Sequence, residues 1–414
     1  MKVALIKASQ ESDFKQYKKY VGAPPQSIFS AAAALEGVAD IEMYDETSGK
    51  AAPAKLKAEL AVIFMSTPDA LRAYQLADAY MAKGIKVILG GLHTTFMPQE
   101  ALLHAHSIIK GESDALWPQI LLDVAANKMQ PVYQADQAFD LKQVKPYPTR
   151  YLNAGIYKNI WSVTVSRGCR FKCHYCTIPN FFKNQTYRPI GQVVDEIKQS
   201  GAQYIELKAD NLTSDREYCL ELFEALTPLN IQWVAETNLR FADDEELLQL
   251  ASKSGLIYLL VGLETPSKSA LKEASKGFNN IHKSKEYIDK LHQHKIVVDS
   301  CMLFGFDEHN KDIFDDTWDY IHDVELDVCH PVIMIPFPGT PLFNDLEQQG
   351  RILTRDWSLY DGVHAVYQPQ NMSSKELEQG HQKFVDRYYS ATESLARKWR
   401  QTRRFGMSTA YMLP

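Results

Sequence analysis

The stretch Trp161-Ser-Val-Thr-Val-Ser-Arg-Gly-Cys169-Arg-Phe-Lys-Cys173-His-Tyr-Cys176 decides which fold and which chemistry this chain can support. Its first half predicts a β-strand over 161–166, and three thiols follow at C-x-x-x-C-x-x-C spacing. A structural zinc site normally takes four protein ligands, and His174 is the only nearby candidate for a fourth. A 4Fe–4S cluster needs one thiolate per iron, so three cysteines leave one iron open to another group. Three buried thiols without a metal are the remaining alternative, and the spacing favours the cluster.

Composition places the chain among globular proteins, because 45% of its 414 residues are hydrophobic and 23% are charged. No apolar stretch is long enough for a membrane span, and Met1–Ile6 runs into a strand rather than a signal peptide. A net charge of −6 gives no support to a general nucleic-acid binder. The six cysteines do not form a disulfide framework, since none precedes Cys169 and three stand alone. We therefore expect a cytoplasmic protein.

Residues 1–130 alternate between apolar strands and helical segments such as Pro68–Lys83, which predicts a doubly wound, Rossmann-like parallel sheet. The strand candidates are Lys2–Ile6, Ile41–Tyr44, Leu60–Met65, Lys86–Leu89 and Ser107–Lys110. Residues 131–157 contain Pro131, Pro146 and Pro148 and no clear periodicity. We expect them to be a linker between two domains.

Six further strand–helix units predict a partial (β/α)6 barrel over 158–345, with functional residues at the carboxyl ends of its strands. The strand candidates are Trp161–Ser166, Tyr204–Lys208, Gln232–Glu236, Leu256–Gly262, Val297–Leu303 and Cys329–Ile335. Residues 346–414 form a C-terminal extension. Its last helix is expected to begin at the capping box Ser373-x-x-Glu376 and to run to about Arg400.

The cysteine run resembles the signature of radical SAM enzymes, and the resemblance covers the whole second half of the chain. It implies a 4Fe–4S cluster on Cys169, Cys173 and Cys176. The open iron would bind the amine and carboxylate of S-adenosylmethionine, whose reductive cleavage gives a 5′-deoxyadenosyl radical. Arg167, Arg170 and Lys172 flank the cysteines. They either offset the charge of the cluster or belong to a solvated loop.

The same resemblance implies the residues that hold S-adenosylmethionine. Tyr175 would touch the adenine, Asp210 and Asn211 the methionyl amine, and Glu264 the ribose or carboxylate. Pro338 and Gly339, in the run Pro-Gly-Thr-Pro-Leu, would line the base. The chain departs from the family where Lys208-Ala209-Asp210 replaces a Gly-Gly-Glu run. Structural roles remain open: a helix cap for Asp210, a helix-start charge for Glu264 and a rigid turn for the proline run.

The first domain is similar to the cobalamin-binding domain that precedes the barrel in one class of radical SAM enzymes. Paired glycines after a parallel strand let a ligand approach the backbone. The residues implied are Ser66, Thr67, Gly90, Gly91, His93, Gly111 and Glu112. The Asp-x-His-x-x-Gly run is absent and no histidine precedes His93, so cobalamin would bind without a lower histidine ligand. A domain that has lost the cofactor and serves only as a scaffold is the alternative. His93 itself either lies near the corrin or is a hydrogen-bonding loop residue.

The resemblance therefore implies a cobalamin-dependent radical SAM enzyme, with methylation of an unactivated carbon as the leading reaction. Oxidative cyclisation, rearrangement and a non-catalytic corrinoid-binding protein are the alternatives. Methylthiotransferases are disfavoured, because the front domain has no cysteine for a second cluster. We expect a small-molecule or peptide substrate and a flavodoxin or ferredoxin as the electron donor. The basic stretch Arg397–Arg404 either docks that donor or packs on the barrel.

Overall fold

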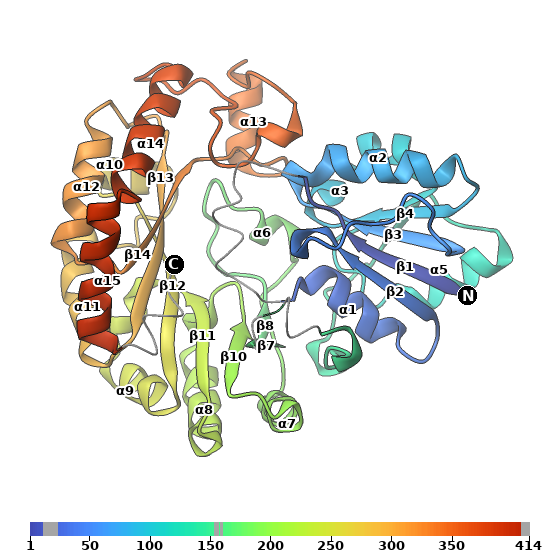
Figure 1. The fold of residues 1–414 in the computed structure, drawn as a ribbon, viewed down its shortest axis with the longest axis horizontal. Helices are drawn as coiled ribbons and strands as arrows, with labels where there is room; N and C mark the ends of the chain where they lie inside the picture. The colour runs from blue at the N-terminus through green and yellow to red at the C-terminus, as the bar shows by residue number, and fades with distance from the viewer. Residues whose placement is uncertain (11–23, 153–156, 158–159, 407–414) are drawn as a thin grey trace.

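Two parallel sheets of six strands each, one from each half of the chain, form the framework of the molecule (Figure 1). The computed structural model describes residues 1–10, 24–152, 157 and 160–406. Within these ranges, no helix is both long enough and apolar enough to cross a membrane. The α/β fold class predicted from the sequence is confirmed.

The N-terminal sheet has the strand order β2-β1-β3-β4-β5-β6, and all its neighbouring strands are parallel. Helices α1 (Gln26–Leu35) and α5 (Trp117–Ala126) cover one face, and α2 (Ala70–Met81) covers the other. The strands are β1 (Lys2–Lys7), β2 (Asp40–Asp45), β3 (Leu60–Phe64), β4 (Lys86–Gly90), β5 (Ser107–Lys110) and β6 (Val132–Gln134). The order reverses between β1 and β3. This is where a doubly wound sheet opens a crevice for ligands.

Strand β6 corrects one expectation, because it lies inside the segment 131–157 that the sequence indicated to be a linker. It is an edge strand of only three residues with Val132 39% exposed, so it is too short to give a periodic apolar signal in the sequence. Its pairing with β5 extends the front sheet by one strand.

The second sheet is a partial barrel with the order β14-β13-β12-β11-β10-β7, all parallel, and β7 and β14 are its open edges. The strands are β7 (Ile160–Thr164), β10 (Tyr204–Lys208), β11 (Gln232–Thr237), β12 (Leu256–Glu264), β13 (Val297–Phe304) and β14 (Val328–Ile333). The covering helices are α7 (Ile190–Ser200), α8 (Arg216–Leu226), α9 (Glu245–Lys253), α11 (Ser284–Gln293) and α12 (Ile313–Asp323). The predicted six-stranded partial barrel is confirmed, with five of its strands followed by a covering helix.

Side-chain alternation along these strands gives the barrel an apolar outside and a polar inside. On β10, Ile205 and Leu207 are buried in the core formed with the helices. Glu206 lies on the opposite face, where it accepts a hydrogen bond from Ser162 of β7. Farther round the barrel, the Asp299 carboxylate accepts hydrogen bonds from Tyr258 and, at 2.9 Å, from His330. Charged and hydrogen-bonding groups therefore line the barrel interior.

The capping box at the C-terminal extension is present, since Ser373 accepts from the Glu376 amide and Glu376 accepts from the Ser373 amide. The expected single helix to Arg400 is wrong. Helix α14 (Ser374–Tyr388) ends early, and Ser390 caps a second helix, α15 (Ala391–Phe405), by accepting from the Glu393 amide. The two N-caps satisfy two separate sets of helix-start amides, so the chain can turn between them.

Candidate functional site

The cysteine loop leaves the barrel through a short antiparallel pair, β8 (Ser166–Arg167) with β9 (Thr186–Tyr187). Gly168 follows at φ +84°, and a Cβ at this position would lie 2.6 Å from the Asn184 carbonyl oxygen. Only glycine fits both the backbone angle and the space. The turn at Gly168 thus directs the three cysteines over the carboxyl ends of the barrel strands.

The three cysteines line one cavity of about 350 Å³, which we call the barrel cavity. Of the residues implied for S-adenosylmethionine, Tyr175, Asp210, Asn211 and Glu264 line it too. The rest of its wall includes Phe171, Glu236, Gly262, Lys276, Phe278, Cys301, Ile335 and Phe337. The structure therefore brings residues of five barrel strands, or of the chain just after them, and the cysteine loop to a single site.

The cysteines suit a cluster better than a single zinc ion. Tetrahedral Zn–S bonds of about 2.3 Å would bring the sulfurs to roughly 3.8 Å from one another. Among the described residues, Asp289, His292 and Glu325 are the only three potential ligands whose ligand atoms all lie within 4.8 Å, so the thiols stand wider apart. All three thiols are free. Burial raises the pKa of Cys176 to about 12, so iron binding must displace protons here.

Asp210 and Asn211 both hold the cysteine loop in place. The Asp210 carboxylate accepts a hydrogen bond of 2.7 Å from the Gly168 amide, and burial raises the pKa of this carboxyl. The Asn211 amide nitrogen lies 3.7 Å from the Cys169 sulfur, as a donor. Thr237 and Asn238 donate to the Asn211 oxygen at 3.2 and 3.1 Å, which fixes its orientation. Asn211 thus presents an N–H group to a cluster ligand.

Glu264 forms a buried ion pair with Lys276, a residue that the sequence analysis missed. Glu264 has φ +70°, which is strained for a residue other than glycine. Although burial lowers the pKa of Lys276, the charges of Glu264 and Cys173 outweigh it and raise that pKa. The Lys276 ammonium also lies 3.4 Å from the Tyr175 hydroxyl. A fixed positive charge therefore stands beside the cysteines.

Pro338 and Gly339 do not line the barrel cavity, whereas Ile335 and Phe337 just before them do. Gly339 has φ +83°, and a Cβ there would lie 2.1 Å from the Phe96 ring of the front domain. Its carbonyl accepts a hydrogen bond of 2.7 Å from Asn180. The structure places Gly339 at a contact between the domains.

A second cavity, of about 290 Å³, lies at the crevice between β1 and β3, and we call it the front cavity. Of the residues implied for cobalamin, Ser66, Gly91, Gly111 and Glu112 line it. Lys7, Leu92, Asp114 and Arg167 are also in its wall. A Cβ on Gly111 would meet nothing within 4 Å, so the backbone there is open to a ligand. The site's position and its small side chains suit a large flat cofactor.

Thr67, Gly90 and His93 do not line the front cavity. The His93 side chain is fully buried, with its ring nitrogens 3.4 Å from the Thr67 hydroxyl and 3.5 Å from Glu100. Its ring also meets Trp357 of the C-terminal extension edge-on at 5.0 Å. This geometry supports a hydrogen-bonding role for His93, but in the short helix α3 (Leu92–Phe96) rather than in a loop.

Gly91 has a packing role as well as a place in the wall. A Cβ on Gly91 would lie 2.4 Å from the Met65 carbonyl oxygen, and its φ is +105°. The glycine is therefore required by the approach of β4 to the chain after β3. A substitution there would disturb the sheet edge before it filled the cavity.

Arg167 joins the two domains. Its buried guanidinium donates to Glu112 at 2.8 Å and to both oxygens of Asp114 at 3.0 and 3.1 Å. It neither lies in a solvated loop nor has a free charge to offset a cluster. Two carboxylates of the front domain already neutralise it.

The front and barrel cavities share two wall residues, Ile178 and Asp210. Ile178 begins α6 (Ile178–Phe181), directly after the last cysteine of the loop. A ligand in either cavity would thus touch the same two side chains. This adjacency could not be read from the sequence.

Glu236 and Lys276 are the functional candidates that sequence reasoning missed. Glu236 lies at the end of β11, a position that could have identified it. It is open to the barrel cavity but surrounded by protein, and burial raises its pKa to about 7. No hydrogen bond joins it to the described part of the chain. Lys276 lies in the loop after α10 (Lys268–Glu273), where no sequence pattern marks it.

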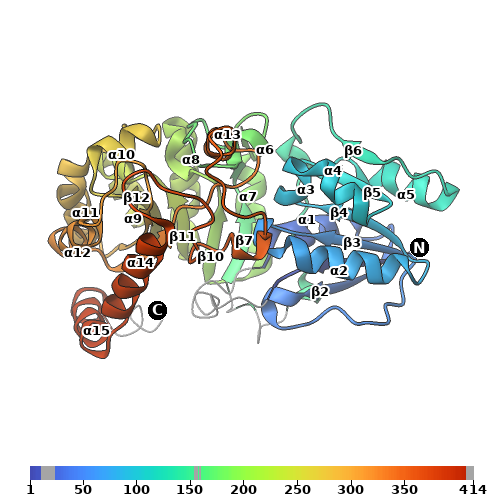
Figure 2. The same cartoon turned by 90° about the horizontal axis from the view of Figure 1, so that it is seen from above.

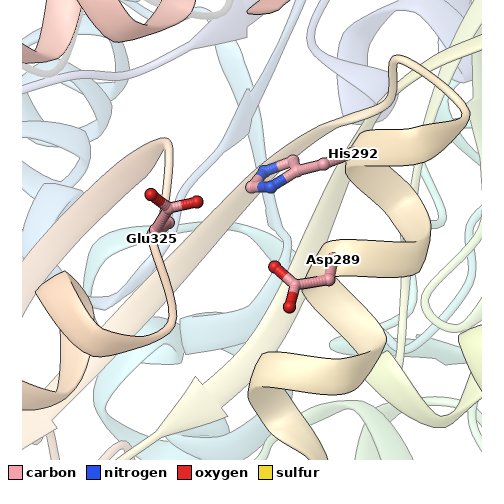
Figure 3. Close-up of side chains that lie close together, drawn as sticks. All are labelled: Asp289, His292 and Glu325. Carbon is pink, nitrogen blue, oxygen red and sulfur yellow. The ribbon is translucent and has the colours of Figure 1, made fainter.

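The compact ligand group Asp289, His292 and Glu325 lies elsewhere, at the C-terminal part of α11 and in the turn before β14 (Figure 3). Lys285 donates to Asp289 at 3.1 Å, and Arg404 donates to Glu325 at 2.6 Å. His292 is engaged with Asp327 at 2.8 Å. Protein cations thus already neutralise these carboxylates.

Comparison with known proteins agrees with this geometry. Residues 163–321 match the family model "Radical SAM superfamily". Bacteriochlorophyllide d C-12(1)-methyltransferase of Chlorobaculum tepidum is 28% identical over 85% of this chain and 80% of its own length. The anaerobic magnesium-protoporphyrin IX monomethyl ester cyclase of Cereibacter sphaeroides is 25% identical over 79% of this chain and 58% of its own.

Among solved structures, the cobalamin-dependent S-adenosylmethionine radical enzyme OxsB, with aqua-cobalamin and S-adenosylmethionine bound, has the same fold. Its TM-score is 0.72 at 12% identity, over 98% of this chain and 70% of that one. Both the front sheet and the barrel are thus included in the match. The chain therefore contains a radical SAM domain over 163–321, and its arrangement of a front sheet followed by a barrel is that of a solved radical SAM enzyme that binds cobalamin.

Proposed function

We propose that this protein uses cobalamin and S-adenosylmethionine to methylate an unactivated carbon of a small molecule. The observation that carries the proposal is the pair of adjoining cavities, which share Ile178 and Asp210. A methyl donor and a radical source can act on one carbon only if both reach it, and adjoining cavities meet that need. The methyltransferase relative, similar over 85% of the chain, supports the same reaction.

When bound, the cluster with S-adenosylmethionine supplies a 5′-deoxyadenosyl radical, and cobalamin supplies the methyl group. Cys169, Cys173 and Cys176 would hold the cluster, and Asn211 would donate to the Cys169 sulfur. Lys276 would offer a positive charge to the carboxylate of S-adenosylmethionine, and Asp210 and Glu264 would accept from its amine or ribose. Ser66, Gly91 and Gly111 would leave the backbone of the front domain open to the corrin.

Oxidative cyclisation is the second candidate, on two observations. One relative is a cyclase. The Glu236 carboxylate in the barrel cavity, with its pKa near 7, can accept a proton at neutral pH. A radical oxidation must release a proton from the substrate, whereas a radical methylation need not.

The two reactions differ in what they make from S-adenosylmethionine. Methylation consumes one molecule as radical source and one as methyl donor, so 5′-deoxyadenosine and S-adenosylhomocysteine should form in equal amounts. Cyclisation should give 5′-deoxyadenosine alone. The measurement is product analysis after anaerobic reconstitution with iron, sulfide and hydroxocobalamin, with dithionite as reductant and a tetrapyrrole as first substrate to try. If the reconstituted protein makes neither 5′-deoxyadenosine nor S-adenosylhomocysteine, whether substrate is present or absent, the proposal fails.

Free thiols throughout the chain suit a reducing compartment, so we place the enzyme in the cytoplasm. A cluster of this type is also lost to oxygen, so an anaerobic setting fits the same chemistry. Cell fractionation under nitrogen tests the location.

A further inference from the structure

A basic hollow of about 540 Å³ lies on the surface beside the cysteine loop. Four cations surround it: Arg240, Lys268, Lys272 and Lys283. Asp243 is the one acidic residue in its wall, and it pairs with Lys283 at 3.3 Å. The whole chain carries a net charge of −6, so a local excess of positive charge stands out. We call this surface the basic hollow.

Three of the four cations have no partner within the described part of the chain. Arg240, Lys268 and Lys272 are all exposed, and none of them makes an ion pair or a side-chain hydrogen bond there. Cations that stabilise a fold are usually paired or lie along apolar surface. Unpaired cations around a concave surface instead attract an anionic partner and steer its approach.

The basic hollow is in direct contact with the cysteine loop. Phe278 lines both the hollow and the barrel cavity, and its ring stacks on Phe171, between the first two cysteines, at 4.1 Å and 17°. Ala274, the residue directly after α10, accepts a hydrogen bond of 3.0 Å from the His174 amide. These two stacked rings lie between the hollow and the cysteines. A protein seated in the hollow would bring its own redox group close to the loop.

We infer that the basic hollow docks an acidic one-electron carrier protein that reduces the cluster. This inference rests on the proposed function, because only a cluster in the barrel cavity needs the electron. The step transfers one electron from the reduced flavin or iron–sulfur group of the carrier to the cluster. The carrier is oxidised by one electron, the cluster is reduced by one, and no bond forms or breaks.

The basic C-terminal helix is a weaker candidate for this role. Arg397 is buried over the Tyr388 ring at 4.1 Å, and Arg404 pairs with Glu325 and Asp327. Figure 2 shows α10 and α6 along one edge of the barrel and α15 at the opposite edge. The exposed cations of α15 therefore lie across the barrel from the cysteine loop. They provide a matched control for the basic hollow.

The test compares two charge-reversed proteins: Lys268→Glu with Lys272→Glu, and Lys398→Glu with Arg403→Glu. All four residues are exposed. With reduced flavodoxin as the probe, the first pair should slow cluster reduction, followed by stopped-flow absorbance, by roughly tenfold at low salt. The slowing should shrink at high salt, and the second pair should change the rate less than twofold. With dithionite, 5′-deoxyadenosine formation should be unchanged in both.

Each other result overturns the docking assignment. Equal slowing by both pairs would mean that the net charge of the protein, and not the basic hollow, sets the rate of reduction. A larger effect of the second pair would place the docking site at α15. Loss of dithionite activity in the first pair alone would make these lysines structural. If the unaltered protein forms no 5′-deoxyadenosine with dithionite, the proposed function fails instead, so the two failures are distinguishable.

Discussion

The front cavity and the barrel cavity adjoin, yet their walls are built from different chemistry. The front cavity is lined mainly by backbone, serine, glycine and apolar side chains, and most of its charged groups are paired, as Arg167 is with Asp114. The barrel cavity contains four thiols and unpaired or strained ionisable groups, among them Glu236 and Glu264. One wall selects by shape and the other by charge. A cavity that holds a preassembled cofactor needs little more than space, whereas one where electrons move needs fixed charges.

Breaking the barrel cavity should have the largest effect. Cys173→Ala removes one of the three proposed cluster ligands, so the reconstituted protein should lose the brown chromophore and all 5′-deoxyadenosine formation. Iron content and product analysis measure this, with Cys219→Ala as the control because Cys219 is buried among α8 residues away from the cavity. Retention of both iron and product by Cys173→Ala, or zinc in place of iron, would contradict the cluster.

Removing the ion pairs between the two domains should have the next largest effect. Arg167→Met leaves Glu112 and Asp114 buried without their cation, which costs about 3–5 kcal/mol. Urea unfolding should show the loss, and Arg170→Met, at an exposed neighbour, should show little. A triple change of Arg167, Glu112 and Asp114 to apolar residues should recover most of the stability. If Arg167→Met is as stable as the parent protein, the ion pairs do not join the domains.

Filling the front cavity should impair cobalamin binding without affecting the iron site in the barrel cavity. Leu92→Trp adds bulk to the wall and should lower hydroxocobalamin retention about tenfold, with iron content unchanged. Leu103→Trp, 77% exposed on the same domain, is the control.

His93→Ala should leave the absorption spectrum of bound cobalamin unaltered, since His93 is turned into the protein. A spectral change in that variant would mean that His93 ligates cobalt.

A smaller effect should follow from the hydrogen bond to sulfur. Asn211→Leu removes the N–H group that faces Cys169, and hydrogen bonds to cluster sulfurs favour the reduced state. The reduction potential should fall by on the order of tens of millivolts in a titration followed by electron paramagnetic resonance. Asn180→Leu is the control, because its amide donates to Gly339 instead. An unshifted potential would show that this contact does not reach the cluster.

The smallest expected effect concerns pH. Burial raises the pKa of Glu236 to about 7, so between about pH 4.5 and 7 the folded protein keeps a proton that the unfolded chain releases. The stability from this group is therefore present in acid and lost as the pH rises. Glu236→Gln should gain roughly 1–2 °C in melting temperature over the parent at pH 8, but not at pH 5. Glu221→Gln, at an exposed glutamate, should show no such trend. The same result for both variants would place Glu236 in ordinary solvent.

The fold was predictable because both sheets consist of apolar strands whose ends are marked by polar or glycine residues. For the same reason, the sequence predicted residues that the structure brings to the barrel cavity: the three cysteines, Asp210, Asn211 and Glu264, which follow strands or end them. It could not show in which direction a side chain points, so His93 and Gly339 were included although they pack against Trp357 and Phe96. It also missed Lys276, since a loop residue brought to a site by tertiary folding carries no periodic signal.

Ile178 and Asp210 stand in the walls of both cavities, so an occupant that moves either side chain would change binding on the other side. Whatever fills one side sets the position of side chains that the other side must accommodate. If an occupant of the front cavity tightens binding in the barrel cavity by some factor, the reverse effect must have the same size. Loading is then a matter of order as well as affinity.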